Sequence, residues 1–288
     1  MEKQKVAYIY ALLAVFFWST VATAFKISLK YVDFLQLLFI SSLTSTIVLF
    51  LILVSTGKVR LLRTLDFQQI LRSLLAGFLN PFLYYVVLFK AYSLLPAQEA
   101  QPLNYTWPLV LVLFSVILLK QRIRVKDIFG LLIGFSGVIV ISTRGNLLSL
   151  KLSDPLGVSL AVGSAFIWSA FWIFNMKDER DDILKLFLNF LFGFFFVSIA
   201  MMFFSRPYLD VHGVLSAIYV GMFEMGITFV VWLKALNLSK TTALVSNLVF
   251  LSPFISLIFI HFILGEGILP STIIGLFLIV TGILVQRS

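Results

Sequence analysis

One carboxylate lies inside an otherwise apolar run of this sequence. Glu224 falls near the middle of residues 213–235. An ionisable group surrounded by hydrocarbon costs at least ~2.5 kcal/mol unless it is paired or hydrated. Such a carboxylate can balance a cationic group on a solute, exchange a proton, or bond to a neighbouring helix as a structural group. The sequence leaves these three roles open.

An amide occupies the matching position of an earlier apolar run. Asn80 precedes Glu224 by 144 residues, and the two runs align around these positions. Asn80 and Tyr84 share a helical face because they are four residues apart, and Thr228 and Trp232 continue the face of Glu224. Two polar groups at matching depth predict one site to which both runs contribute.

Tyrosine and tryptophan side chains form a second group of candidates. Trp168, Trp172 and Asn175 follow one helical stripe, whereas Tyr105 and Trp107 flank a polar stretch just before a proline. Their flat rings with polar handles suit aromatic or amphipathic solutes and cations, and an interfacial aromatic belt is the alternative interpretation. The predicted substrate-binding residues are Asn80, Tyr84, Tyr105, Trp107, Trp168 and Glu224, and the further cavity or hinge candidates are Trp18, Pro81, Trp172, Asn175 and Asn247.

The chain lacks the residues that several common kinds of catalytic and metal-binding site require. It has no cysteine and only two histidines, so we expect neither a thiolate nucleophile nor a metal site built from these residues. The phosphate-binding pattern G-x-x-x-x-G-K-[ST] is absent. The acidic cluster at residues 178–182 has no partner cluster with which to hold Mg²⁺ and a diphosphate. We therefore predict no enzyme activity, no cofactor and no bound metal.

The elements that position these residues must be membrane helices. Sixty per cent of the chain is apolar, 12% is charged, and the mean hydropathy is +1.05. A soluble domain needs a larger charged coat, and apolar runs of about 20 residues match the thickness of a bilayer. An isolated span can satisfy its backbone in lipid only as a helix. We predict ten spans, at residues 6–25, 34–54, 71–92, 97–119, 128–142, 156–176, 183–204, 213–235, 241–264 and 269–286.

The ten spans divide into two similar copies of five. Residues 77–108 recur from Gly221 onward, so that Gly77 matches Gly221, Lys90 matches Lys234 and, after a slip of one residue, Pro108 matches Pro253. The predicted copies are residues 1–145 and 152–288. Because each copy has an odd number of spans, the second must enter the membrane from the opposite side. Inverted repeats of this kind are typical of transporters.

The basic residues predict an orientation. With the N-terminus inside the cell, 16 of the 22 Lys and Arg residues fall on the inner side. The net charge of +9 therefore indicates orientation in the membrane, and nucleic acid is not an expected partner. We predict a protein of the cell (inner) membrane with both termini in the cytoplasm.

The chain resembles the EamA branch of the drug/metabolite transporter superfamily. The resemblance covers the whole chain and rests on the two five-span copies, the Trp-Ser pairs at Trp18 and Trp168, the prolines of the fourth and ninth spans, and Gly265-Glu266 followed by further glycines. It implies a ten-helix exporter around a central cavity, which aromatic-amino-acid exporters of the family line with Tyr and Trp. Gln121 occupies in the first copy the position that Glu266 occupies in the second. Because only one copy has an acid there, Glu266 is expected to have a structural role and not a role in transport.

The predicted function is secondary transport. The leading prediction is an exporter of small metabolites, amino acids or related amphipathic compounds, that works by alternating access and draws on a proton gradient or on the gradient of the solute. The expected partners are a small-molecule substrate and the lipid bilayer. The alternatives are an integral membrane enzyme of lipid or prenyl metabolism and a lipid flippase.

Overall fold

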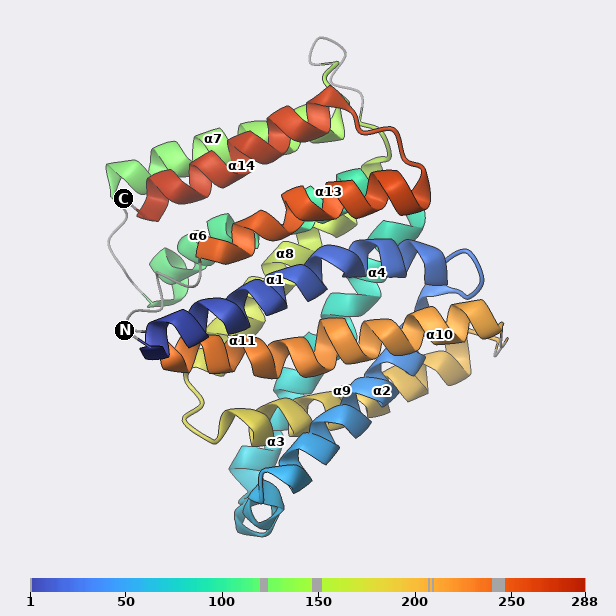
Figure 1. Ribbon diagram of the computed structural model, residues 1–288, viewed down its shortest axis with the longest axis vertical. Coiled ribbons are helices and arrows are strands. Elements are labelled where there is room, and N and C mark those ends of the chain that lie inside the picture. The colour runs from blue at the N-terminus through green and yellow to red at the C-terminus, as the bar shows by residue number, and fades with distance from the viewer. Residues whose placement is uncertain are drawn as a thin grey trace. The chain divides into compact units, whose positions relative to one another are not determined.

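Helices make up almost all of the described chain. The computed structural model describes residues 2–119, 124–146, 152–206, 208, 210–239 and 247–287, and no β-strand occurs within these ranges. Figure 1 shows the long helices and the connections between them. The prediction of an all-α chain is confirmed.

Six described helical stretches are long and apolar enough to cross a membrane: Lys3–Ser28, Phe34–Ser55, Phe67–Leu94, Pro155–Asn175, Asp182–Phe204 and Val211–Leu238. They coincide with the first, second, third, sixth, seventh and eighth predicted spans. Three shorter apolar helices, Ile128–Ser142, Leu248–Leu264 and Pro270–Val285, coincide with the fifth, ninth and tenth. The chain is therefore a multi-pass membrane protein, and the count of ten spans stays a prediction.

The predicted fourth span, residues 97–119, is broken into two helices. α5 (Ala97–Asn104) is followed by Tyr105 as its C-cap residue, and α6 (Trp107–Leu119) begins two residues later. Pro108 lies in the first turn of α6, where the N–H that proline lacks has no intrahelical partner in any case. The sequence predicts one continuous span over residues 97–119, and the structure instead places Pro108 at the start of a new helix.

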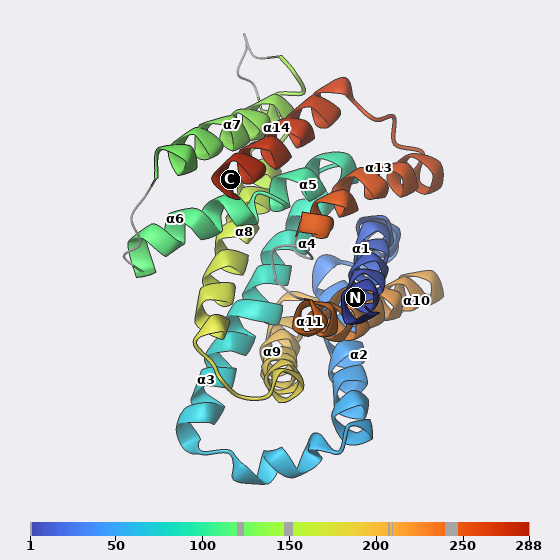
Figure 2. The ribbon, with the colours of Figure 1, turned by 60° about the vertical axis from the view of Figure 1, so that its left-hand side comes forward.

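The chain divides into two compact units, and the first comprises residues 1–83 and 179–259. In Figure 2 the short segment η1 joins α2 to α3 within this unit. The elements of unit 1 are α1 (Glu2–Ser28), α2 (Phe34–Ser55), η1 (Lys58–Thr64), α3 (Phe67–Gly77), η2 (Phe78–Leu83), α9 (Asp182–Phe204), α10 (Val211–Val220), η3 (Gly221–Gly226), α11 (Ile227–Leu238), η4 (Asn247–Phe250) and the first part of α13 (Leu251–Leu264).

The second unit comprises residues 84–178 and 260–288. Its elements are α4 (Tyr84–Leu94), α5, α6, α7 (Val125–Ser142), α8 (Pro155–Met176), the end of α13 and α14 (Pro270–Arg287). Both units draw helices from both halves of the sequence. The compact units are therefore not the same divisions as the two predicted copies.

The helix pairs inside the two units follow one rule. In unit 1, α1 packs on α10 and α11, and in unit 2, α8 packs on α4. α1 and α8 are the first spans of the two predicted copies, and their partners belong to the third spans. The second spans pair in the same way, since α2 packs on η3 and α9 packs on α3 and η2. Each first or second helix therefore pairs with the third helix of the other copy.

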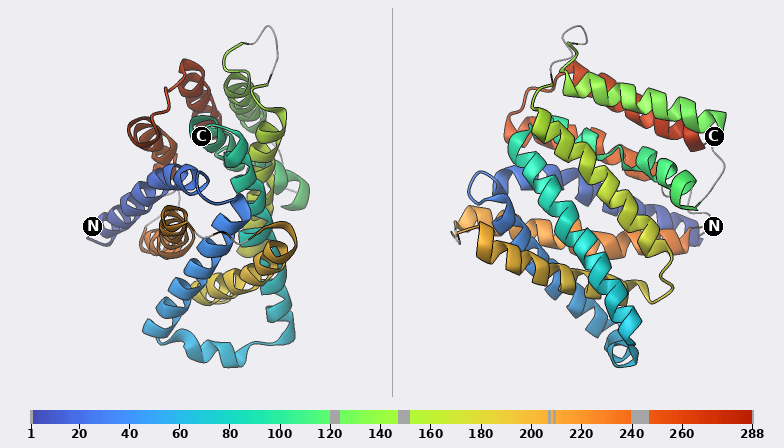
Figure 3. Two further views of the ribbon diagram at one scale, coloured as in Figure 1. Left: turned by 90° about the vertical axis from the view of Figure 1, so that its right-hand side faces the viewer. Right: turned by 180° about the vertical axis from the view of Figure 1, so that it is seen from behind.

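Glycines let α7 and α14 approach closely in unit 2, where Figure 1 and Figure 3 show the two helices side by side. A Cβ on Gly137 would lie 2.5 Å from the carbonyl oxygen of Gly275, and a Cβ on Gly275 would lie 2.7 Å from that of Gly137. A Cβ on Gly282 would meet the carbonyl oxygen of Gly130. These small residues therefore have a packing role between the two helices.

In the part of the chain that the structure describes, five aspartates cap the N-termini of helices. Each side-chain oxygen accepts hydrogen bonds from backbone N–H groups that have no partner within the first turn of the helix. The capping aspartates are Asp33 of α2, Asp66 of α3, Asp154 of α8, Asp181 of α9 and Asp210 of α10. Much of the small acidic content of the chain therefore has a structural role at helix ends.

One of these caps also forms an ion pair. Lys58 Nζ lies 2.6 Å from Asp181 Oδ2, while Asp181 Oδ1 accepts from the N–H groups of Ile183 and Leu184. Partial burial alone would raise the pKa of Asp181, but the hydrogen bond and charge of Lys58, together with the two backbone donors, lower it below its usual range. The ion pair ties η1 to the start of α9.

Replacement of Lys58 by Met is expected to lower the free energy of unfolding by about 1 kcal/mol. Because the pKa of Asp181 is lowered by folding, the stabilisation is complete above its unfolded value of about 3.9 and is lost as the pH falls through the lower folded value. Thermal unfolding in detergent, followed between pH 7 and pH 3, measures this. Lys3→Met is the control; an equal effect of both substitutions at every pH would contradict the assignment.

Candidate functional site

The predicted site residues are divided between the two units. Trp18, Asn80, Pro81, Glu224 and Asn247 belong to unit 1, and Tyr84, Tyr105, Trp107, Trp168, Trp172 and Asn175 belong to unit 2. Asn247 opens η4, and its side chain lies outside the described part of the structure.

A chain of hydrogen bonds crosses three helices of unit 2. The Tyr84 hydroxyl on α4 donates to Asn104 Oδ1 at 3.3 Å, and Asn104 Nδ2 on α5 donates to Ser164 Oγ at 2.8 Å. The Ser164 hydroxyl on α8 donates to the carbonyl of Ala161. All three polar side chains are buried. Sequence reasoning did not select Ser164, although its position four residues before Trp168 places it on the same helical face.

Aromatic rings pack against this chain of hydrogen bonds. The rings of Tyr84 and Trp168 have centroids 4.7 Å apart, and those of Trp168 and Trp172 are 6.0 Å apart in an edge-to-face arrangement. Trp172 Nε1 is buried and has no hydrogen-bond partner within the described residues. We call Tyr84, Asn104, Ser164 and Trp168 the aromatic–amide cluster. It combines ring faces with groups that donate and accept hydrogen bonds.

Other predicted residues of unit 2 lie nearby in sequence but are less buried. Tyr105 and Trp107 are half-buried at the break between α5 and α6, and Asn175 is half-buried near the end of α8. The Ser169 hydroxyl lies 2.8 Å from the carbonyl oxygen of Trp107, and in unit 1 Ser19 Oγ lies 3.4 Å from Ser252 Oγ. In both units the serine of the repeated Trp-Ser pair therefore contacts the residue just before a proline. This residue is Trp107 before Pro108 and Ser252 before Pro253.

Matching six-residue segments of unit 1 leave α-helical geometry. η2 and η3 are both π-helical, and they contain Asn80 and Glu224 respectively. Asn80 has extended backbone angles inside η2, and its peptide bond to Pro81 is cis. A wide turn of this kind is common at functional sites. Pro81 was among the predicted cavity or hinge residues, whereas an irregular turn around Glu224 was not predicted.

The side chain of Asn80 is an unusual buried group. It is 0% exposed, and within the described residues neither Oδ1 nor Nδ2 has a hydrogen-bond partner. An amide left without partners in an apolar surrounding costs on the order of 2 kcal/mol or more. Pro81 packs against Gly193 of α9, where a Cβ would lie 2.5 Å from the proline Cγ. Tight packing therefore holds this amide in place.

Glu224 lies in a half-buried segment with aromatic neighbours. Phe223, the preceding residue, has its ring 4.8 Å from that of Phe17, and the Thr228 hydroxyl donates to the Phe223 carbonyl. Trp18 contacts Trp232, with ring centroids 5.4 Å apart. Trp18 therefore packs on the eighth predicted span in unit 1, as Trp168 packs on Tyr84 of the third span in unit 2.

Glu266 has a structural role, as the resemblance implied. Its two carboxylate oxygens accept from the backbone N–H groups of Ala97 and Gln98, at 3.0 and 3.2 Å, and so cap α5. The Gln98 side chain in turn donates to Gly267 O and accepts from Leu269 N. Buried Glu99 pairs with Arg144. These contacts fix the start of α5, which carries Asn104 of the aromatic–amide cluster.

The described residues contain no group of three or more His, Asp or Glu side chains placed to hold a metal ion. In the acidic loop, Asp181 caps α9 and Asp182 pairs with Lys185 at 3.0 Å. The loop therefore uses its acids to begin a helix.

Comparison with known proteins gives one consistent result. A model of the EamA-like transporter family matches residues 5–143 and again residues 155–287. An uncharacterized transporter of Clostridium kluyveri is 25% identical over 99% of this chain and 94% of its own length. The aromatic amino acid exporter YddG of Ancylobacter novellus is 32% identical over 34% of each chain. A crystal structure with 23% sequence identity covers 97% of this chain and 95% of its own with a TM-score of 0.67, which shows the fold.

Proposed function

Because this chain belongs to the EamA-like transporter family, we propose that it is a secondary exporter of small amphipathic metabolites, with amino acids as the leading class. The observation that carries the proposal is the aromatic–amide cluster of unit 2, where ring faces adjoin buried hydrogen-bonding groups. Such a surface suits a solute with an aromatic part and a polar part. The similarity to an aromatic amino acid exporter adds support.

The proposed mechanism is alternating access by two inverted five-helix copies, residues 1–145 and 152–288. Two observations support it. The family model matches the chain twice, and the helix pairs inside each unit recur with the copies exchanged. Inverted copies allow one fold to adopt two nearly equivalent states that open to opposite sides. The π-helical segments η2 and η3 give both third helices an irregular turn at the same place.

The proposed energy source is a proton gradient or the gradient of the solute itself. Glu224 is the residue proposed to exchange the proton or to balance a cationic group of the solute, because it lies half-buried within a membrane-spanning helix. Asn80, at the matching position of the other copy, is proposed to bond to the polar part of the solute.

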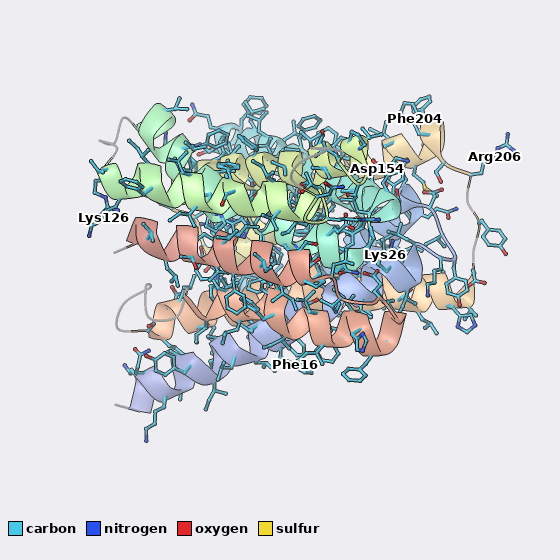
Figure 4. The ribbon with its side chains drawn as sticks, turned by 90° about the horizontal axis from the view of Figure 1, so that it is seen from above. Phe16, Lys26, Lys126, Asp154, Phe204 and Arg206 are labelled. Carbon is cyan, nitrogen blue, oxygen red and sulfur yellow. The ribbon has the colours of Figure 1, made fainter. Side chains whose placement is uncertain are left out.

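We also propose that both termini lie in the cytoplasm, in the inner membrane of the cell. The unequal distribution of Lys and Arg supports this orientation. Figure 4 shows Lys126 and Asp154 at opposite ends of the helices of unit 2, as expected if α7 crosses the membrane between them.

Replacement of Trp168 by Leu is expected to raise the KM for phenylalanine and tryptophan about tenfold, because the solute loses a ring face. Counterflow of labelled amino acids in proteoliposomes measures this directly. Phe166→Leu is the matched control, because Phe166 lies on the same helix but is 37% exposed. The KM of the Phe166→Leu variant should stay within twofold of the wild-type value.

The wild-type protein provides the test of the function itself. Counterflow of an amino acid, inhibited by structurally related solutes, supports the proposal. Activity confined to lipids, or no counterflow of any amino acid, amine or nucleoside, contradicts it. A KM that does not change in Trp168→Leu would instead contradict the assignment of the aromatic–amide cluster while leaving transport in place.

A further inference from the structure

Two arginines project from one face of the connection between α2 and α3. The segment η1 (Lys58–Thr64) is a 3₁₀-helix, in which side chains three residues apart are eclipsed. Arg60 and Arg63 therefore share a face, and both are exposed. Gly57 precedes them with a φ of +71°, a left-handed conformation that suits glycine and turns the chain out of α2.

Within the described residues, the charges of this pair are not paired with an acid. Neither Arg60 nor Arg63 has an ion-pair partner among the described residues, whereas Lys58 is neutralised by Asp181. The nearest acid in the sequence, Asp66, accepts from Gln69 N as the cap of α3. An exposed guanidinium pair on one face of a short helix is suited to a phosphate group, which accepts hydrogen bonds from both.

Both ends of the connection are fixed, so the arginine pair has a defined position. Lys58 bonds to Asp181 at 2.6 Å, and Arg180 Nη1 donates to the carbonyl of Gln69 at 2.9 Å. The two attachments involve adjacent residues at the start of α9. This arrangement reduces the conformational entropy that η1 would lose on binding a ligand.

The following helix shows where the connection lies with respect to lipid. Phe67, four residues after Arg63, is 78% exposed, and it begins a stripe of exposed apolar side chains along α3. The stripe continues through Leu71, Leu75 and Phe78 at intervals of three or four residues. An apolar stripe on a membrane-spanning helix faces acyl chains, so the arginines just before its first residue lie at the level of the headgroups.

We infer that Arg60 and Arg63 bind the phosphate of an anionic phospholipid, whose acyl chain packs against Phe67. The inference does not depend on the transported solute. It differs from general attraction between basic loops and lipid, because it requires the paired guanidinium groups and the adjacent ring. Figure 2 shows η1 between the ends of α2 and α3.

The test is a titration of the full-length protein in detergent with phosphatidylglycerol or phosphatidylcholine, read by native mass spectrometry. We expect the wild-type protein to prefer the anionic lipid. The double substitution R60Q/R63Q should weaken binding of phosphatidylglycerol roughly 10- to 30-fold. R60K/R63K should recover only part of the affinity, because lysine keeps the charge but not the planar fork. Thermal unfolding confirms that each variant is folded.

The matched control removes the same charge elsewhere. Lys3 and Lys5 are exposed on α1, and K3Q/K5Q should change the affinity less than twofold. Equal losses in K3Q/K5Q and R60Q/R63Q would overturn the inference in favour of general electrostatics. Phe67→Ser should weaken lipid binding as well. If it does not, and glycerol 1-phosphate competes fully, the site takes free phosphate and the lipid assignment is wrong.

Discussion

Glu224→Gln is expected to reduce transport driven by a pH gradient by roughly 100-fold and to remove its pH dependence. Glutamine keeps the shape and hydrogen-bonding capacity of the side chain but cannot carry a proton or a negative charge. Glu224 is half-buried in a π-helical turn of a membrane-spanning helix, where an ionisable group indicates a function. Proteoliposomes with an imposed pH gradient measure the effect.

Counterflow separates the two roles proposed for Glu224. If the carboxylate exchanges a proton, Glu224→Gln should lose gradient-driven transport and retain solute exchange. If it balances a cationic group, both activities should fall and the KM for amine-bearing solutes should rise. Glu266→Gln is the matched control, because Glu266 caps α5 and should affect stability only. Unchanged gradient-driven transport in Glu224→Gln would show that this acid is structural.

Gly193→Ala and Gly221→Ala are each expected to lower the free energy of unfolding by about 2–3 kcal/mol. A Cβ on Gly193 would lie 2.5 Å from the rigid ring of Pro81, and one on Gly221 would lie 2.5 Å from the carbonyl oxygen of Ser41. Neither obstacle is the end of a flexible side chain, so a helix must shift. The melting temperature in detergent should fall by roughly 4–10 °C.

Gly163→Ala is the control for this pair. Among the described residues that Gly163 contacts beyond its own turn of α8, no atom lies within 4 Å of its Cβ position. This substitution should be neutral or stabilise the protein by up to about 1 kcal/mol, since alanine favours a helix over glycine. If all three variants unfold at the same temperature, the close approach of η2 to α9 and of η3 to α2 does not limit stability.

Both glycine contacts allow a π-helical segment to pack closely against a neighbouring helix. Gly77 and Gly221 occupy matching positions at the two π-helical segments, and each packs against the backbone of the second span of the other predicted copy. A Cβ on Gly77 would lie 2.9 Å from Gly193 N. Asn80 and Glu224 each lie three residues beyond such a contact. In each predicted copy, the glycine contact therefore fixes the helix three residues before its polar residue.

Hydropathy alone located most of the helices, because a membrane span is a local property of about 20 consecutive residues. Nine predicted spans coincide with described apolar helices, and the all-α class is confirmed. The break between Asn104 and Trp107 was not predicted. The residues before the break are largely polar and those after it are apolar, but a change of this kind does not by itself end a helix. The break is accompanied by contacts between helices, such as that of Ser169 with the Trp107 carbonyl.

The sequence by itself determined the membrane class, the apolar spans, the repeated residues and the candidate pair Asn80 and Glu224. Tertiary structure alone decided the grouping of Tyr84, Asn104, Ser164 and Trp168, since these residues lie on three helices that are distant in the sequence. It also revealed that the Asn80 amide has no partner within the described residues. Hydrogen bonding and burial depend on neighbours from other helices, which periodicity along one helix cannot specify.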